Sequence, residues 1–293
     1  HELEFLQIFS NDHLVIEANA FFGLSALTEL YLPQNSIEIV RADTFRGLEN
    51  LIALSLFGNY IKVLEANAFK GLIKLVLLEM PHLQILTLER HAFVGLVSLQ
   101  RLFLTDCSTL EMIEPDAFQG LSALVELDLA RSGISTIRSK MFADLGSLNS
   151  LKLLGSPIEA VEGDDSFQGL SSLTELDMSK SKMKTLRNGT FAGLSGLLRL
   201  SLAESPIRLV EPDAFRGLSA LAELYLHSTE IETLQSEQFR GLDNLTKLWL
   251  KESKIRAIET SAFRTGLSKL SELDLSILFW LDSTLTSERF VGL

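Results

Sequence analysis

The sequence predicts an α/β solenoid, an arc of about twelve repeats of 24 residues with a parallel β-sheet along its concave side. Two observations predict this fold: a leucine that recurs at a nearly constant interval, and a phenylalanine that recurs with it. The composition agrees, because 46% of the 293 residues are hydrophobic and 22% are charged, as in globular proteins. We expect a single domain over residues 1–293.

The recurring leucine marks the first position of each expected strand. From Leu54 onward, alternation places Leu54 and Leu56 in the core and turns Ala53 and Ser55 outward. Eight of the eleven intervals between successive anchor leucines are 24 residues and three are 25, so each repeat adds one strand in register. The anchors are Leu3, Leu27, Leu51, Leu75, Leu99, Leu124, Leu148, Leu173, Leu197, Leu221, Leu245 and Leu270.

After each strand the chain is expected to return along the convex side in short irregular or 3-10 segments. In one repeat, Ile61 and Leu64 form a second apolar set, and Phe69 fills the convex side of the core. A stacked column of such rings buries a large area, and stability comes from contacts between neighbouring repeats. The column comprises Phe21, Phe45, Phe69, Phe93, Phe118, Phe142, Phe167, Phe191, Phe215, Phe239, Phe263 and Phe290.

The position eight residues after each anchor holds a short polar side chain in most repeats. Such a side chain can hydrogen-bond backbone groups that the turn would otherwise bury without partners. The single cysteine, Cys107, occupies this position, so we predict a reduced, buried thiol and not a nucleophile. The other members of this turn ladder are Asn11, Asn35, Asn59, Leu83, Ser132, Ser156, Ser181, Ser205, Thr229, Ser253 and Leu278.

The repeat resembles that of the extracellular leucine-rich-repeat proteins of animals, the group of Toll receptors, Slit-like proteins and chaoptin-like adhesion proteins. The shared pattern is Leu-x-x-Leu-x-Leu-x-x-Asn-x-Ile-x-x-Ile followed by Phe-x-Gly-Leu. Residues Leu27 to Leu48 follow it, with Val40 at the last aliphatic site, and the resemblance covers essentially all 293 residues. It implies an extracellular or cell-surface glycoprotein, such as a receptor ectodomain or adhesion protein, that is secreted or tethered by another segment.

The sequence departs from that group in two respects. Serine and threonine replace asparagine in the turn ladder from Ser132 to Ser253. Neither end carries a cysteine-rich cap, and the chain runs from His1 to Leu293 in repeat register. Because an uncapped end would expose core leucines, we expect a fragment that lacks its N- and C-terminal caps.

Two segments match the acceptor pattern for N-glycosylation, namely Asn188-Gly-Thr190 and Asn244-Leu-Thr246. Asn188 is expected on a turn of the convex side and is therefore the more accessible of the two. We predict a glycan on at least one of these asparagines.

Charge and motif content exclude several classes of function at this level. The net charge of −12 argues against nucleic acid and against an anionic membrane surface as partners. No apolar stretch is long enough to insert directly into a membrane. We expect no enzyme activity, cofactor or metal, because no nucleophile elbow, phosphate loop or metal-ligand spacing is present. The acidic cluster of Glu159, Glu162, Asp164 and Asp165 is interpreted as a solvated bulge.

Function must then lie on the outward strand positions. Aromatic residues flanked by charges are typical of protein-binding hot spots, although single exposed aromatics are also common without a role. We expect the aromatic group from Phe5 to Phe103 to contribute more contact energy than the charges from Glu126 to Arg199, which can pair across strands. The predicted concave protein-binding residues are Phe5, Phe9, Tyr31, Phe57, Leu77, Phe103, Tyr225 and Trp249.

These observations favour a non-catalytic module for recognition or adhesion that binds a protein ligand or associates with a copy of itself. A structural matrix or filament component, assembled through repeat surfaces, is the first alternative. An intracellular leucine-rich-repeat scaffold is the second, and the lone cysteine favours it.

Overall fold

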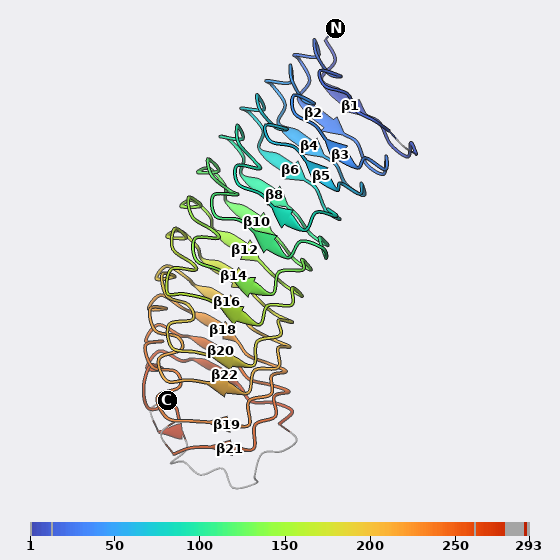
Figure 1. Cartoon of the computed structure of the whole chain (residues 1–293). Coiled ribbons are helices and arrows are strands. Elements are labelled where there is room, and N and C mark those ends of the chain that lie inside the picture. Colours follow the sequence, from blue (N-terminus) through green and yellow to red (C-terminus); the bar gives the residue numbers. More distant parts are fainter. Residues whose placement is uncertain (1, 13, 261, 279–289, 292–293) are drawn as a thin grey trace. The chain divides into compact units, whose positions relative to one another are not determined.

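The computed structural model describes residues 2–12, 14–260, 262–278 and 290–291. Within them, each repeat adds one strand to a parallel sheet, so the chain is a solenoid of leucine-rich turns (Figure 1). The chain divides into two compact units, unit 1 (His1–Ile134 and Lys140–Lys152) and unit 2 (Ser135–Ser139 and Leu153–Leu293).

In the described residues of unit 1, seven strands of three residues each form one parallel sheet in chain order. The register follows the repeat, because Leu6 lies opposite Leu30 and Leu30 lies opposite Leu54. The strands are β1 (Phe5–Gln7), β2 (Glu29–Tyr31), β4 (Ala53–Ser55), β6 (Leu77–Glu79), β8 (Arg101–Phe103), β10 (Glu126–Asp128) and β12 (Ser150–Lys152).

Unit 2 repeats the arrangement with five such strands among its described residues. Leu200 lies opposite Leu224, which in turn lies opposite Leu248. The strands are β14 (Glu175–Asp177), β16 (Arg199–Ser201), β18 (Glu223–Tyr225), β20 (Lys247–Trp249) and β22 (Glu272–Asp274).

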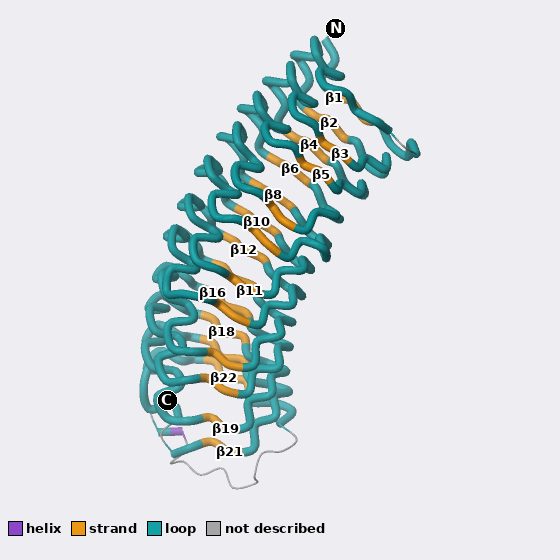
Figure 2. Tube along the Cα trace, viewed as in Figure 1, coloured by secondary structure: helices purple, strands orange, loops and turns teal. Residues whose placement is uncertain are grey.

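A second series of two-residue strands lies on the opposite side of each unit and pairs two by two (Figure 2). In unit 1, β3 pairs with β5 and β7 with β9; in unit 2, β11 pairs with β13, β15 with β17 and β19 with β21. The strands are β3 (Ile39–Val40), β5 (Val63–Leu64), β7 (Thr87–Leu88), β9 (Met112–Ile113), β11 (Thr136–Ile137), β13 (Ala160–Val161), β15 (Thr185–Leu186), β17 (Leu209–Val210), β19 (Thr233–Leu234) and β21 (Ala257–Ile258).

These short strands replace the 3-10 segments expected from the sequence, which the structure does not confirm. The chain is extended there because one residue in eight of these ten strands, such as Val40 or Leu186, is buried in the core while its backbone pairs with the next repeat. Turns without helical repetition complete the path to the phenylalanine.

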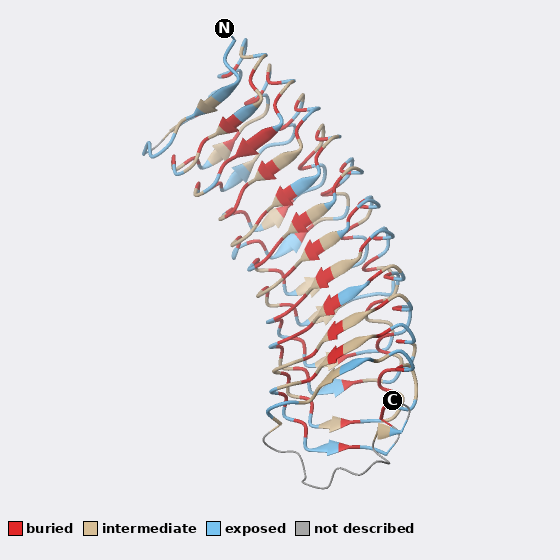
Figure 3. Ribbon diagram, turned by 180° about the vertical axis from the view of Figure 1, so that it is seen from behind, coloured by how far each residue is buried: buried red, intermediate tan, exposed pale blue. Residues whose placement is uncertain are grey.

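The core of each unit contains the middle leucines of the strands on one side and the phenylalanine column on the other (Figure 3). Eleven of the twelve described phenylalanines of the column are buried, and Phe290 is half-buried. Within each unit, successive rings are stacked with centroids 5.9–6.4 Å apart. The predicted column is therefore confirmed in both units.

The turn ladder is also confirmed, with asparagine in the first turns of unit 1 and hydroxyl side chains from Ser132 onward into unit 2. In unit 1, Asn59 Oδ1 accepts hydrogen bonds from the backbone N–H groups of Asn35 and Ile37, each at 3.0 Å. Its Nδ2 donates to the carbonyl oxygens of Leu32 and Leu56, each at 2.8 Å. One buried side chain therefore forms hydrogen bonds with four backbone groups of the turn.

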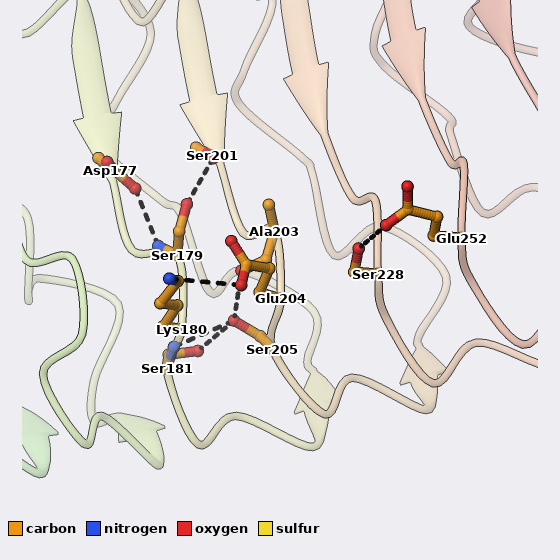
Figure 4. A network of polar contacts seen from close by, with 10 residues as sticks. All are labelled: Asp177, Ser179, Lys180, Ser181, Ser201, Ala203, Glu204, Ser205, Ser228 and Glu252. Atoms are coloured by element: carbon orange, nitrogen blue, oxygen red, sulfur yellow. Dashed lines mark hydrogen bonds and ion pairs between the residues drawn. The ribbon is translucent and has the colours of Figure 1, made fainter.

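In unit 2 a hydroxyl replaces the amide (Figure 4). Ser205 Oγ accepts from the backbone N–H of Ser181 at 3.1 Å and from its hydroxyl at 3.0 Å. It donates to the carbonyl oxygen of Ala203 at 3.3 Å. Both serines are buried, so the serine ladder connects successive turns with fewer bonds per side chain than asparagine does.

Cys107 lies in the ladder as predicted, fully buried and outside any disulfide. Its Sγ is 3.5 Å from the carbonyl oxygen of Thr105 and 3.9 Å from that of Met80. Burial raises the pKa of the thiol to about 12, so the thiol stays neutral at physiological pH.

Candidate protein-binding face

The first and third residues of each three-residue strand point away from the core and form the sheet face of each unit. The alternation predicted from the sequence holds, because the middle residue of β2, β4, β8 and β18 is a fully buried leucine. The turn that follows each strand extends the same face. This face is the surface that the sequence predicts to be concave.

The sheet face of unit 1 carries six of the predicted binding residues. Phe5, Phe9 and Phe57 are exposed, by 50%, 62% and 47% of their surface, whereas Tyr31, Leu77 and Phe103 are half-buried. The rings of Phe5 and Tyr31 are brought together, with centroids 5.6 Å apart. Burial, followed by the charge of Glu29, raises the pKa of Tyr31.

Phe57 and Phe103 lie apart from that pair. Phe57 packs edge-on against His82, with ring centroids 6.1 Å apart, and strands β4 and β6 separate Phe103 from Tyr31. Ala53 and Ser55 face outward on β4 but are only 9% and 4% exposed. These small side chains are buried because larger neighbours on β2 and β6 flank them. Alternation in the sequence predicts their outward direction correctly but does not predict this burial.

The outward charges of unit 1 pair across neighbouring strands, as predicted. Lys152 Nζ lies 2.6 Å from Glu126 Oε1, and the Arg131 guanidinium binds the Asp106 carboxylate at 2.5 and 2.8 Å. The hydrogen bond from Arg131 lowers the pKa of Asp106. Burial raises the pKa of Asp128, which also accepts a hydrogen bond from the backbone N–H of Ala130 at 2.9 Å.

In unit 2 the first residues of the strands alternate in charge across the sheet. Arg199 pairs with Glu175, and Lys247 Nζ lies 3.4 Å from Glu223 Oε1. In the following turns Lys180 pairs with Glu204 at 3.4 Å (Figure 4). These exposed pairs fix side-chain orientation more than they add stability.

Tyr225 and Trp249 form a stacked pair at the third positions of β18 and β20. Their ring centroids are 4.1 Å apart and their planes differ by 2°. Tyr225 Oη donates to Glu223 Oε2 at 2.8 Å, and Lys247 Nζ lies 5.7 Å from the centroid of Trp249. Burial and the bond to Glu223 raise the pKa of Tyr225 to about 12, so it stays a phenol.

His227 completes this aromatic cluster, which the sequence alone did not reveal. Its ring meets Tyr225 edge-on at 6.4 Å, and its Nδ1 atom is buried without a hydrogen-bond partner in the described part of the chain. The available signal was positional: Tyr225 and Trp249 are 24 residues apart, which puts them side by side on paired strands.

The two predicted glycosylation sites differ in their surroundings. Asn188 is exposed in the turn after β15, and its side-chain amide has no hydrogen bond among the described residues. Asn244 is also exposed, but its Nδ2 donates to Ser219 O at 2.7 Å and its Oδ1 accepts from Lys269 at 2.6 Å. Whether either site is modified stays a prediction.

Within the described residues, no helix is long and apolar enough to cross a membrane. Nor do three or more His, Cys, Asp or Glu side chains meet there in a way that could hold a metal ion. The sheet face, with its exposed and stacked aromatic side chains, is the candidate site.

The chain belongs to the Leucine rich repeat family, which matches it over residues 1–61, 53–108, 104–158, 161–207, 171–231, 196–255 and 219–276. No curated protein sequence matches it. The confirmed family agrees with the resemblance noted in the sequence at the level of the fold.

Solved structures of the Toll type are similar to this chain. In the TLR13–ssRNA13 complex the similarity has a TM-score of 0.76 and 25% identity, over 93% of this chain and 42% of that one. In the Drosophila Toll–Spatzle complex the values are 0.67 and 22%, over 89% and 37%. The chain therefore spans about two fifths of the length of these proteins.

A chain of the octameric complex of Latrophilin 3, Unc5D and FLRT2 is also similar, with a TM-score of 0.71 and 24% identity, over 85% of this chain and 74% of that one. Identities below 25% show the fold alone. Since the complex of TLR13 contains single-stranded RNA, the comparisons do not support the exclusion of nucleic acid as a partner.

Proposed function

We propose that this chain is a non-catalytic protein-binding module that uses its sheet face, in a cell-surface or secreted protein for recognition or adhesion. The stacked pair of Tyr225 and Trp249 carries the proposal. Large aromatic side chains that are already held in place lose little entropy on binding and bury much apolar area. Glu223 and Lys247 hold this pair before any partner arrives.

The surroundings of the pair support a protein partner. Alternating charges on β14, β16, β18 and β20 form a polar rim, and rims of this kind set orientation and association rate more than affinity. The exposed rings of Phe5, Phe9 and Phe57 offer a second apolar contact area on unit 1. A protein ligand can use aromatic and charged groups together.

The extracellular location rests on the similarity to Toll, solved in complex with Spatzle, and to a chain of the complex of FLRT2 with Latrophilin 3 and Unc5D. The two glycosylation motifs are consistent with it. Self-association, as in a matrix or filament component, is the main alternative. The intracellular scaffold is a further alternative. The free, neutral thiol of Cys107 is consistent with it.

Nucleic acid is the weaker candidate partner. The chain has a net charge of −12, and the cations of the sheet face are largely engaged by carboxylates, as Lys152, Arg199 and Lys247 show. Binding to phosphates depends on cations that can release counterions.

The proposal is tested by screening the multimerised chain against secreted proteins and ectodomains from its source. The variant Tyr225→Ala/Trp249→Ala is compared with Leu209→Ala, an exposed apolar residue of unit 2 on β17, away from the sheet face. We expect a partner whose binding the double variant weakens by roughly tenfold or more, with Leu209→Ala unchanged. The reverse pattern would place binding on the opposite side.

Two further measurements separate the alternatives. Sedimentation of the chain alone reports self-association, which the structural alternative requires at micromolar concentration. Fluorescence anisotropy with labelled single-stranded RNA reports nucleic-acid binding. A chain that self-associates or binds RNA without any protein ligand would contradict the proposed function.

A further inference from the structure

A hollow of about 380 Å³ lies on unit 2, on the side opposite the sheet face, between β13 and β15. These strands belong to different two-stranded sheets, and no hydrogen bond joins them in the part of the chain that the structure describes. The two segments are joined by a hydrogen bond from Lys182 N to Ile158 O and separate after it. The backbone edges that face each other across the hollow are therefore unpaired.

Three cations line this hollow, namely Lys182, Lys184 and Arg187. All three are exposed, and none has an ion pair among the described residues. One carboxylate, Glu159, lines the same hollow. The lining is thus positive in a chain whose net charge is −12, and Asp164 of the acidic cluster lies beside it, next to Gly189.

A second hollow of similar volume provides a comparison within the same protein. It measures about 400 Å³ and lies on unit 1 between β5 and β7, which are likewise unpaired with each other. Its cations Lys62 and Arg90 are each paired with a carboxylate, Glu38 at 2.7 Å and Glu114 at 3.9 Å. The two hollows thus share a backbone arrangement. The cations of the hollow between β5 and β7 are paired with carboxylates, whereas those of the hollow between β13 and β15 have no ion pair among the described residues.

We propose that the hollow between β13 and β15 is a binding site for a tetrahedral oxyanion, the sulfate or phosphate group of an ester. Lysine and arginine donate charge-assisted hydrogen bonds to such groups, and unpaired backbone N–H groups add to them. The apolar part of the lining, Ala160, Val161 and Pro206, suits the carbon framework that carries the ester. This site is independent of the sheet face and of the proposed function.

The test is a titration followed by nuclear magnetic resonance at the backbone amides of Lys184 and Thr185. The probes are glucose 6-sulfate and glucose 6-phosphate, which share a framework and differ in the ester, with sodium chloride at matched ionic strength. We expect saturable shifts with one or both esters and only small linear shifts with chloride. The ester that binds more tightly identifies the source of the oxyanion.

Two variants test the assignment of the residues. Lys182→Ala/Lys184→Ala should weaken binding by roughly tenfold or more, because charge-assisted bonds are lost. Lys62→Ala/Arg90→Ala in the other hollow should leave it unchanged. Glu159→Gln should strengthen binding of an anion, whereas it would weaken binding of a cation. Circular dichroism and thermal unfolding confirm that each variant is folded.

Three results would overturn the proposal. Shifts with chloride as large as those with the esters would show screening alone. Equal losses in the two double variants would place the site elsewhere. Weaker ester binding by Glu159→Gln would mean that the hollow does not select anions.

Discussion

Single residues of this protein owe their properties to the repeat in which they lie. Cys107 occupies a position that is asparagine or serine in most other turns, and burial, not a catalytic partner, determines its chemistry. Tyr225 is a half-buried phenol because Glu223 and the stacked Trp249 surround it. The burial that raises the pKa of both residues therefore comes from their positions in the repeat.

Cys107 should resist thiol reagents in the native protein. The thiol is fully buried and its pKa is raised to about 12, so little thiolate forms at neutral or mildly alkaline pH. We expect labelling by a chromogenic disulfide reagent at pH 8 to be slow in buffer and fast in guanidinium chloride. Equal rates in the two solvents would contradict the buried assignment.

The pair of Asp106 and Arg131 should make stability depend on pH. The pKa of Asp106 is lowered in the folded state, so its contribution is present above the ordinary aspartate pKa and is lost as pH falls through the lowered value. Since both groups are partly exposed, Asp106→Asn should reduce the free energy of unfolding by only about 0.2–1 kcal/mol at pH 7. Denaturation curves should show this difference shrinking as the pH falls below the ordinary aspartate pKa, and a constant difference would refute the assignment.

At the scale of elements, asparagine and serine make different numbers of hydrogen bonds in the turn ladder. Asn59 bonds four backbone groups, whereas Ser205 accepts from Ser181 and donates to one carbonyl. The turn after each phenylalanine requires glycine for a different reason. At Gly47 the φ is +94°, and a Cβ would lie 3.2 Å from Phe22 Cα. The Phe-x-Gly pattern as a whole follows from the positive φ, which recurs at Gly71 and Gly217 although a Cβ there would meet nothing within 4 Å.

Replacing a ladder asparagine should cost more than replacing a ladder serine. Asn59→Ala leaves the N–H groups of Asn35 and Ile37 and the carbonyl of Leu32 without their partner and should lower the free energy of unfolding by about 3 kcal/mol. Ser205→Ala should lower it by about 1 kcal/mol. Urea denaturation of the two variants checks this, and equal costs would show that the two ladders are equivalent.

The sequence predicted the elements that depend on strict periodicity. The strand register, the phenylalanine column and the ladder all follow from leucine and phenylalanine spacings of 24 or 25 residues. The two-by-two pairing of the short strands was not predictable, because two residues carry no alternation signal and their pairing depends on the backbone path between repeats. The contact of Tyr225 with Trp249 depends in the same way on side-chain geometry across strands.

At the scale of the whole molecule, the predicted site residues are spread over two units, and each aromatic contact lies within one unit. Phe5 with Tyr31, Phe57 with His82, and Tyr225 with Trp249 are separate contacts. Charged residues occupy many of the other outward positions. Affinity is therefore expected to come from a few anchored rings, with the charges as rim.

Glycosylation should favour Asn188 over Asn244. The amide of Asn188 is free among the described residues, whereas that of Asn244 is engaged by Ser219 and Lys269. We expect glycopeptide analysis of protein from the natural source to find higher occupancy at Asn188. Occupancy at Asn244 with a bare Asn188 would contradict this, and two bare sites would favour the intracellular scaffold.

The choice of charge variants for a binding test follows from the structure. Asp128 and Asp177 each accept a hydrogen bond from a backbone N–H, of Ala130 and Ser179, so their reversal would also disturb a turn. Lys152 and Arg199 instead form ion pairs with the carboxylates of Glu126 and Glu175, so their reversal inverts charge at cross-strand ion pairs of the sheet face.

The most direct test of the central claim compares aromatic and charge variants for one identified partner, by binding kinetics at low and high salt. Alanine at Trp249, Tyr225 or Phe57 should weaken affinity by roughly tenfold at both salt concentrations, through faster dissociation. Lys152→Glu and Arg199→Glu should change mainly the association rate, and only at low salt. If the charge reversals dominate at both salt concentrations while the aromatic variants bind normally, the sheet face does not bind through its anchored rings.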